Sequence, residues 1–471
     1  MKKFIWLLSL ALIVCCSKNN GNQEDPKPEP QPEPQPELTV YEQSIESVSV
    51  SPTDNALRFN VVINKKKECS TVVEVRKVGE ESWQKMPGEM ALLLYPNTEY
   101  ECRVGVENSY GDPVSFTTGA LPDGIPSCEM TLNEGGPTSG YIIQHKESAP
   151  GYVTISDVYG KVMWYERFDE PVRTVDYQLE TGKLALMHGT YLFPGDKTTP
   201  KPARQIIVMG LDGKRYLTID ASEQTVMYPH HELRLLPGGN MLTLNHTSRQ
   251  YDLTSVGKPA DSVVWSDIFV EIDPTGKPVW EWNIFDQMDI VAYWPILKEY
   301  RPKMGIMSDF VHTNSLDKDS DGNYYASLYY PEEIWKIDGK TKEVLYKYGP
   351  LGDVTIEGGY PLGGYHSVVV LAPDKFMVVK NPRKLTEPLR AQIIQVDPAS
   401  KTAVRLMDVP SDVAFASTSH CNVQVLPDGE TVMFNSTQGN ALAFTDMTGK
   451  NLRVLSRSVT CNRALYFEKM F

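Results

Sequence analysis

Histidine is the residue type whose placement in this sequence most clearly suggests chemistry. Of the eight histidines, His231, His312 and His366 each stand at the start of an apolar segment that leads into a turn. A neutral imidazole near pH 7 can act as a nucleophile or exchange a proton. Three histidines that converge therefore predict covalent group transfer or acid–base catalysis. For each one alone, a packed residue of the fold is the alternative. No metal is expected, because neither converging carboxylates nor a His-x-His spacing accompanies them.

A repeated turn indicates the elements that must position these histidines. It has the form Asp-x-x-Gly-Lys, or a variant of it, between two apolar segments, and recurs about every 58 residues. Its copies begin at Asp157, Asp212, Asp273, Asp338, Asp397 and Asp446. A second turn, such as Pro237-Gly238 or Pro427-Asp428, interleaves with the first. Asp and Gly supply the backbone conformations of hairpin turns, so each period predicts two hairpins.

Two hairpins per period mean four strands, and six such periods predict a six-bladed β-propeller over residues 125–471. Five blades with an irregular one, or seven with a hidden one, are the alternatives. Equivalent positions in successive blades are related by rotation about the propeller axis. If the histidines open the innermost strands, their side chains converge at one mouth of the channel. Cys421, preceded by His420, occupies the analogous place in a fourth unit.

The amino terminus predicts export. Lys2 and Lys3 precede an apolar run over residues 4–14, which ends at Cys15 and Cys16. Such a short basic and apolar segment is typical of a signal sequence, and the cysteines resemble a loose bacterial lipobox. We expect a lipoprotein signal over residues 1–16, with either cysteine lipidated; an ordinary cleaved signal is the alternative. The protein would then be held by its lipid on the outer membrane, in the periplasm or at the cell surface.

Two further regions precede the repeats. Residues 17–38 alternate Pro with Lys, Gln and Glu, which favours an extended linker. Residues 39–120 contain alternating apolar stretches typical of a β-sandwich. The segment Leu94–Tyr100 resembles the corner of fibronectin type III-like sandwiches, where a tyrosine hydroxyl bonds back to the backbone. The fold class predicted is therefore all-β.

Charge and cysteine content limit the partners. The chain has 46 basic and 60 acidic residues, a formal net charge of −14, which argues against nucleic-acid binding because that binding depends on neutralising phosphates. Export permits disulfides. Of the five cysteines after Cys16, we expect Cys69 to pair with Cys102 and Cys421 with Cys461, which leaves Cys128 over.

Three histidine segments carry a resemblance to a known family. Residues 230–240, 309–315 and 364–368 resemble signatures of the PAPS-independent bacterial arylsulfotransferases, as does the outline of an exported chain with a small sandwich before a propeller. The resemblance covers about residues 40–471. It implies transfer of a sulfuryl group from a phenolic sulfate ester to a phenolic acceptor. The route is ping-pong through a sulfohistidine, and no cofactor is implied.

The resemblance also implies roles for individual residues. His366 looks like the nucleophile, His231 and His312 look like its catalytic partners around the sulfate, and Asn314 lies beside them. The family pattern then places an arginine in the following strand, but residues 326–332 contain none. Tyr329 and Tyr330 can donate hydrogen bonds there. Arg463 and Lys380 are the candidates for the replacement cation.

Three alternatives stay open at this point. The segment Asp317-Lys318-Asp319-Ser320-Asp321-Gly322 matches half of a calcium loop, but Leu328 stands where the loop needs glutamate; we expect an acidic turn, with structural calcium at Asp317, Asp319 and Asp321 as the alternative. The aromatic-rich insertion at about residues 283–307 is either a lid or a packed surface segment. Without catalysis, the chain would be a surface propeller that binds a glycan or protein partner; with water as acceptor, it would be a hydrolase.

Overall fold

The computed structural model describes residues 37–189, 205–220, 228–300, 309–360 and 363–471. Cys15, Cys16 and nearly all of the predicted linker lie outside these residues. The chain divides into two compact units, Met1–Thr39 and Val40–Phe471. Strands account for 51% and helices for 6%, so the all-β prediction is confirmed. Among the helices formed by the described residues, none has the length and apolar character that a membrane span requires.

The first strands of the larger unit form two antiparallel sheets with a shared core, preceded by the short helix α1 (Val40–Ser44). One sheet contains β1 (Ile45–Pro52), β2 (Phe59–Lys65) and β5 (Met90–Ala91). The other contains β3 (Val72–Lys77), β4 (Gln84–Lys85), β6 (Glu99–Val106), β7 (Ser109–Tyr110) and β8 (Val114–Thr117). Tyr100 lies in the core, and its hydroxyl accepts a hydrogen bond from the backbone N–H of Tyr95 at 2.8 Å. This is the backbone bond predicted for the corner.

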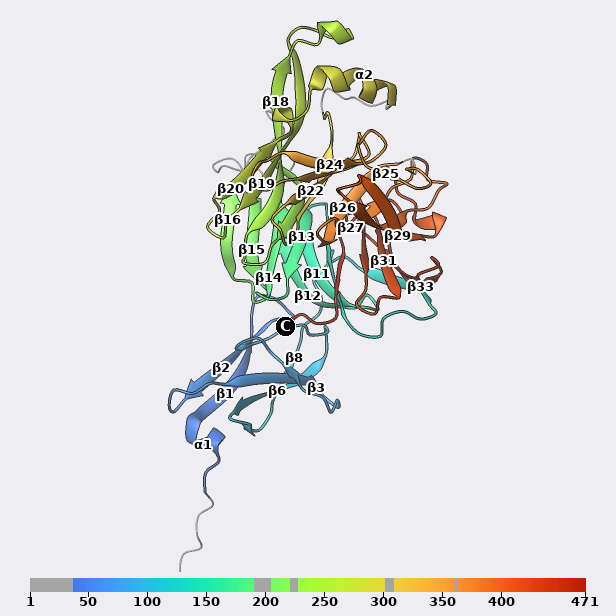
Figure 1. Cartoon of the computed structure of the whole chain (residues 1–471). Helices are drawn as coiled ribbons and strands as arrows, with labels where there is room; N and C mark the ends of the chain where they lie inside the picture. The colour runs from blue at the N-terminus through green and yellow to red at the C-terminus, as the bar shows by residue number, and fades with distance from the viewer. Residues whose placement is uncertain (1–36, 190–204, 221–227, 301–308, 361–362) are drawn as a thin grey trace, which may run out of the picture. The chain divides into compact units, whose positions relative to one another are not determined.

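Six sheets follow in the described residues (Figure 1), and all their strand pairs are antiparallel except one parallel pair in the fifth sheet, β25 (Thr355–Ile356) with β29 (Thr402–Pro410). The first has the order β12 (Val162–Phe168), β11 (Gly151–Asp157), β10 (Tyr141–His145), β34 (Leu465–Phe467). The second runs β13 (Val172–Gln178), β14 (Lys183–His188), β15 (Gln205–Gly210), β16 (Arg215–Asp220). The third runs β17 (Pro229–Leu235), β18 (Met241–Tyr251), β19 (Ser262–Ile272), β20 (Pro278–Asn283).

The remaining three sheets continue the same pattern. The fourth runs β21 (Thr313–Lys318), β22 (Tyr324–Leu328), β23 (Glu333–Ile337), β24 (Val344–Tyr348). The fifth runs β26 (Tyr365–Ala372), β27 (Lys375–Lys380), β28 (Arg390–Asp397), β29 (Thr402–Pro410), β25 (Thr355–Ile356). The sixth runs β30 (Asn422–Val425), β31 (Thr431–Ser436), β32 (Ala441–Asp446), β33 (Asn451–Arg457), β9 (Cys128–Asn133).

The repeated Asp turns join neighbouring strands of these sheets, and the aspartate side chain stabilises each of the turns described next by accepting backbone hydrogen bonds. The Asp157 carboxylate accepts hydrogen bonds from the backbone N–H groups of Tyr159 and Lys161, and Asp273 and Asp446 make the same pair of bonds in their own turns. Gly160 adopts a φ of 85°, which glycine tolerates because it has no Cβ. The turn therefore closes each hairpin locally.

One edge strand of each sheet contacts the corresponding strand of the next sheet. We call these six the inner strands: β34, β13, β17, β21, β26 and β30. The strands β13, β17, β21, β26 and β30 contact one another in that order. Tyr177 of β13 packs its ring against Phe467 of β34 at 5.2 Å. The Asn422 side chain of β30 bonds both to the carbonyl and to the N–H of Ala464, directly before β34. The succession therefore closes on itself.

The aromatic insertion is mainly packed. It contains the helix α2 (Ile290–Tyr300), which lies beside the long β18–β19 hairpin in Figure 1. The Trp294 side chain is 3% exposed and stacks on Phe310 at 5.9 Å, and Trp280 stacks on Tyr324 at 3.6 Å. These contacts favour the packed segment over a lid in the described part of the insertion.

The predicted disulfides are wrong. Cys69, Cys102, Cys421 and Cys461 are all free. Cys102 faces the sandwich core, whereas Cys69 precedes β3 in a half-buried position. The Cys421 thiol contacts the Thr437 hydroxyl, and the Cys461 thiol donates to the Arg463 carbonyl. Pairing by nearness in sequence fails here because the strands separate the thiols.

Candidate functional site

The inner strands of four successive sheets begin with the same backbone irregularity. His231, His312, Ser367 and His420 have φ angles of 49°, 51°, 53° and 55°, a left-handed region that residues with a Cβ rarely adopt. In β17, β21 and β26 the register with the neighbouring strand shifts at this point. A bulge of this kind redirects a side chain, and such strain is concentrated at functional sites. The repeated irregularity therefore marks a site at the start of the inner strands.

The predicted histidines converge there. The ring centroids of His231 and His312 lie 4.9 Å apart. His420 links them to the nucleophile candidate, because it stacks 5.6 Å from His231 and lies 5.9 Å from His366. A small cavity is lined by His231, Asn314, His366 and His420 together with two arginines, Arg173 and Arg463. We call this cavity the histidine pocket.

The hydrogen bonds of His366 determine which ring nitrogen carries its lone pair. Nδ1 lies 2.6 Å from Oδ1 of Asn381, whose Nδ2 donates to the carbonyls of Ser417 and His420. An amide oxygen only accepts, so Nδ1 of His366 carries the proton and Nε2 the lone pair. Nε2 accepts from the His420 backbone N–H at 3.1 Å. Burial and the neighbouring His420 hold the pKa of His366 well below 6.5, so the ring is neutral at neutral pH.

The pKa of His312 is shifted in the opposite direction. Its Nδ1 bonds the Asp309 carboxylate. Burial lowers the pKa of His312, but the negative charge of Asp309 outweighs burial and the pKa is raised above 6.5. Since Asp309 occupies Nδ1, the protonated ring presents Nε2–H as a donor. The neutral imidazole of His366, able to act as a nucleophile, thus lines a pocket beside His312, whose protonated form can act as an acid.

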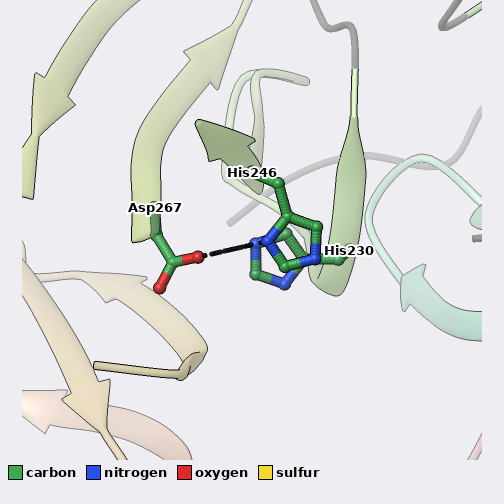
Figure 2. A group of neighbouring side chains, drawn as sticks. All are labelled: His230, His246 and Asp267. Carbon is green, nitrogen blue, oxygen red and sulfur yellow. Dashed lines mark ion pairs between the residues drawn. The ribbon is translucent and has the colours of Figure 1, made fainter. Parts of the chain in front are cut away.

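A buried group of two histidines and one carboxylate lies behind His231. Figure 2 shows His230 of β17, His246 of β18 and Asp267 of β19 side by side. Nε2 of His230 lies 3.0 Å from Oδ1 of Asp267, and Nδ1 of His230 lies 2.8 Å from Nδ1 of His231. Burial, reinforced by His246, lowers the pKa of His230 to about 4. The pKa of Asp267 is lowered as well, because the two histidines outweigh burial.

The two candidate cations occupy different places. Arg463 lines the pocket, but it also forms an ion pair with the buried Glu232 at 2.6 Å. Lys380 of β27 is 2% exposed, bonds the Gly363 carbonyl and lies over the Tyr365 ring. It does not line the pocket. The Lys380 candidacy is therefore wrong, because a second-strand residue lies beneath the inner strand.

Sequence reasoning missed Arg173 and His420 as pocket residues. Arg173 lies at the start of the inner strand β13, and its Nε donates to the Gly189 carbonyl at 3.3 Å. Arg463 lies two residues before the inner strand β34. Each of the six inner strands thus begins beside a histidine or an arginine. Had the matching-position rule been applied to arginine as well as histidine, it would have found Arg173; His420 stands one residue before the matching position, which Cys421 occupies.

The remaining predicted residues have mainly supporting contacts. Asn314 lines the pocket, and its Nδ2 donates to the Tyr365 carbonyl at 2.7 Å. The Tyr329 ring lies 5.0 Å from His366, but its hydroxyl donates to the Thr418 carbonyl at 2.6 Å. That bond uses the hydroxyl proton that we expected Tyr329 to donate to the sulfate. Tyr330 stacks on His312 at 5.3 Å.

The possible calcium loop forms a hairpin turn. Asp317 pairs with Arg234 at 2.9 Å. Asp319 accepts from the backbone of Asp321 and Asn323 and lies 3.5 Å from Nζ of Lys336. Asp321 is exposed. The carboxylates of Asp317 and Asp319 therefore face different partners.

Comparison with known proteins gives one family match. A family model described as Arylsulfotransferase (ASST) matches residues 200–453, which include His231, His312, His366 and His420. No curated protein matches the chain. Among solved structures, the chain is similar to a protein of unknown function from Bacteroides caccae. The two sequences are 12% identical, the TM-score is 0.44, and the match covers 70% of this chain and 100% of that one. A β-propeller domain from Myceliophteria thermophila, Cps50 (Swd1), has 14% identity and a TM-score of 0.40, over 72% of this chain and 89% of that one.

Proposed function

This chain belongs to the arylsulfotransferase (ASST) family, and we propose that it transfers a sulfuryl group from a phenolic sulfate ester to a phenolic acceptor through a sulfated His366, without PAPS. The observation that carries the proposal is the pocket itself. It holds a neutral imidazole with its lone pair on Nε2 and two arginines, and His312, which bonds the Asp309 carboxylate and whose pKa is raised, lies beside its His231. These groups suit the attack on a sulfate ester, the protonation of its leaving oxygen and the binding of its anionic oxygens.

The first half-reaction forms the covalent intermediate. Nε2 of His366 gives up the hydrogen bond that it accepts from the His420 backbone N–H and forms a bond to sulfur while the bond between sulfur and the aryl oxygen breaks. The aryl oxygen keeps the electron pair and takes a proton from Nε2 of His312, so a neutral phenol leaves. Covalent catalysis replaces one difficult transfer by two easier ones. Arg173 and Arg463 are placed to stabilise the negative oxygens of the transferring group.

The second half-reaction is the reverse of the first with a different phenol. The acceptor gives its hydroxyl proton to the now neutral His312 as its oxygen attacks sulfur. The electron pair of the nitrogen–sulfur bond returns to Nε2 of His366. One histidine serves both halves as acid and base, as microscopic reversibility requires when both phenols use one site. Asn381 keeps its role throughout, because Nδ1 of His366 stays protonated.

A non-catalytic propeller that binds a glycan or protein remains the rival function. Assay of the full-length protein with 4-nitrophenyl sulfate and excess phenol, in the absence of PAPS, separates the two. We expect nitrophenolate release that depends on the acceptor phenol. Release at the same rate without phenol indicates a hydrolase. The absence of release with several phenols contradicts the transferase and favours the binding protein.

The rate should fall as pH rises through the raised pKa of His312. The imidazolium is needed for the donor half-reaction, so kcat/KM is full below that pKa and is lost above it. His366 stays neutral because its pKa lies well below 6.5, which places the acidic limb far below neutrality. In Asp309→Asn the opposite charge is gone, and the alkaline limb should move to lower pH. A pH profile of kcat/KM for both proteins tests this; an unmoved limb would contradict the assignment of His312 as acid.

We also propose the finer architecture and location that the sequence predicts. The six sheets would be the blades of a six-bladed β-propeller over residues 125–471, supported by the closed succession of inner strands. Residues 39–120 would be a fibronectin III-like sandwich, and residues 17–38 a linker after a lipoprotein signal. Lipid on Cys15 or Cys16 would hold the enzyme on the outer membrane, where it would meet phenolic esters outside the cytoplasm.

A further inference from the structure

His420 lines the histidine pocket beside the nucleophile. Its backbone N–H donates to Nε2 of His366 at 3.1 Å, and its backbone carbonyl accepts from Nδ2 of Asn381 at 3.1 Å. The centroid of its ring lies 5.9 Å from that of His366. At rest, therefore, the nitrogen that we assign as the nucleophile is covered by a backbone donor.

The hydrogen bond to Nε2 has to break before His366 can attack a sulfate ester. A single lone pair cannot both accept from the N–H and form a bond to sulfur. A backbone N–H that loses its acceptor in a buried site is destabilising, because it has no water to replace the lost partner. The oxygens of the sulfuryl group are bonded to the sulfur that approaches Nε2, so they arrive beside the freed N–H. The substrate itself therefore brings a replacement acceptor.

The pocket must also enlarge to admit a sulfuryl group. Its volume is about 30 Å³, which is close to the share of one molecule in liquid water. A sulfuryl group brings a sulfur and three oxygens and so needs more room than this. A lining segment therefore has to move, and the segment that contains His420 is the one whose N–H also covers the nucleophile.

The backbone at His420 is suited to a local movement. His420 and Cys421 have φ angles of 55° and 77°, so two consecutive residues with a Cβ adopt the rare left-handed region. Strained backbone of this kind is concentrated at active sites and in switch segments. The carbonyls of Ser417 and Thr418 are held by side chains from elsewhere in the chain. The peptide that precedes His420 can therefore rotate while Ser417 and Thr418 stay in place.

The ring of His420 offers a second donor to the same ligand. Among the described residues, the hydrogen bonds of His420 involve its backbone and none involves its ring. Burial, reinforced by His312 and His145, lowers the pKa of the ring to about 4, so the ring is neutral and carries one N–H. In contrast, Nδ2 of Asn314 already donates to the Tyr365 carbonyl. The ring N–H of His420 is thus available to an acceptor that enters the pocket.

We propose that a sulfate ester displaces the backbone N–H of His420 from the nucleophile, and that this N–H and the ring N–H of His420 then bind the oxygens of the transferring sulfuryl group. The inference rests on the proposed function and gives it a specificity. A phenol without a sulfuryl group has no anionic oxygens to draw the N–H away, so His366 stays covered. When the sulfuryl group leaves with the acceptor, the electron pair returns to Nε2 and the N–H bonds to it again. His420 exchanges no proton in either step.

Nuclear magnetic resonance on the full-length protein tests the displacement without turnover. The probe is phenylmethanesulfonate, in which a methylene replaces the ester oxygen so that no transfer can occur. In protein made with isotope-labelled histidine, a coupling across the hydrogen bond should join the His420 amide nitrogen to Nε2 of His366. We expect this coupling in the free protein and with phenol alone, and its loss with saturating sulfonate. The His420→Asn variant identifies the His420 amide resonance, which it lacks.

Substitutions at His420 test the role of its ring. His420→Gly keeps the backbone N–H and the left-handed backbone, which glycine adopts freely, but removes the ring. We expect kcat/KM for 4-nitrophenyl sulfate to fall by about 10²-fold, the lower end of the range for a lost donor to an oxyanion. His420→Asn should recover part of this loss, because asparagine tolerates the left-handed region and its carboxamide can donate.

The matched control is Asn440→Gly. Asn440 is also left-handed, with a φ of 44°, but it is exposed and does not line the pocket, so its replacement should keep the wild-type kcat/KM. A coupling that persists with saturating sulfonate, or that is absent from the free protein, overturns the proposal, as does an unchanged kcat/KM in His420→Gly or no recovery in His420→Asn. A protein that releases nitrophenolate without binding the sulfonate overturns this inference alone. One that neither binds the sulfonate nor releases nitrophenolate contradicts the proposed function, and the inference with it.

Discussion

Replacement of His366 by Ala is expected to reduce acceptor-dependent sulfuryl transfer by about 10⁴-fold or more, as loss of a nucleophile does in other enzymes with covalent intermediates. Nε2 of His366 is the pocket nitrogen that the Asn381 carboxamide holds in the nucleophilic tautomer. His312 should not replace it, because the raised pKa favours its protonated form and its Nδ1 bonds Asp309. The measurement is the initial rate of nitrophenolate release in the presence of phenol.

Trapping of the intermediate makes the result specific. A wild-type reaction quenched without acceptor should carry the mass of one sulfuryl group on the peptide that contains His366, and His366→Ala should carry none. His188→Ala is the matched control, because His188 of β14 packs against Phe168 and is not a lining residue of the pocket. A labelled peptide elsewhere, or a His366→Ala protein within tenfold of the wild type, would refute His366 as the nucleophile.

The second large effect is expected at Arg173. We predict that Arg173→Ala lowers kcat/KM by about 10²- to 10³-fold, the range found when a donor to a developing oxyanion is removed. Arg173 lines the pocket at the matching position of β13. Arg173→Lys should recover only part of the loss, since a lysine keeps the charge but not the planar fork of donors.

Controls for Arg173 use other arginines. Arg167→Ala removes an exposed side chain that pairs with Asp169, and should leave kcat/KM unchanged. Arg463→Ala is expected to reduce stability as well as rate, because it leaves the buried Glu232 without its closest partner. A near-normal rate for Arg173→Ala together with a large loss for a folded Arg463→Ala would transfer the sulfate-binding role to Arg463.

Local sequence patterns predicted much of the site because the repeat itself is local. The Asp turns and the segments that start with His231, His312 and His366 each lie within one sheet, so their relation could be predicted without long-range information. The partners that determine protonation were not predictable in this way. Asn381 follows β27 and Asp267 lies in β19, and only the sheet register brings them to His366 and His230.

The pairing of strands that lie far apart in the sequence could not be predicted either. β9 pairs with β33, and β34 with β10, over more than 300 residues of sequence. No turn or spacing near residue 463 predicts that the segment after it pairs with β10 in the first sheet. Arg463 was therefore only a candidate cation, and the role of its strand in bringing it to the pocket followed from the structure. Lys380 was also proposed as a cation from the sequence alone. Its place in the second strand of its sheet could not be predicted from its nearness to His366 in the sequence.

The closing strand β34 has a consequence for biogenesis. Arg463 and β34 are synthesised after all eight histidines, and β10 lacks its inner partner until they arrive. During synthesis and export the first sheet therefore presents an open edge, which invites pairing with other chains. Contacts this distant in sequence also slow folding. Assembly of the catalytic pocket would thus be among the last events in the maturation of the polypeptide, so no partly made chain could act on a sulfate ester.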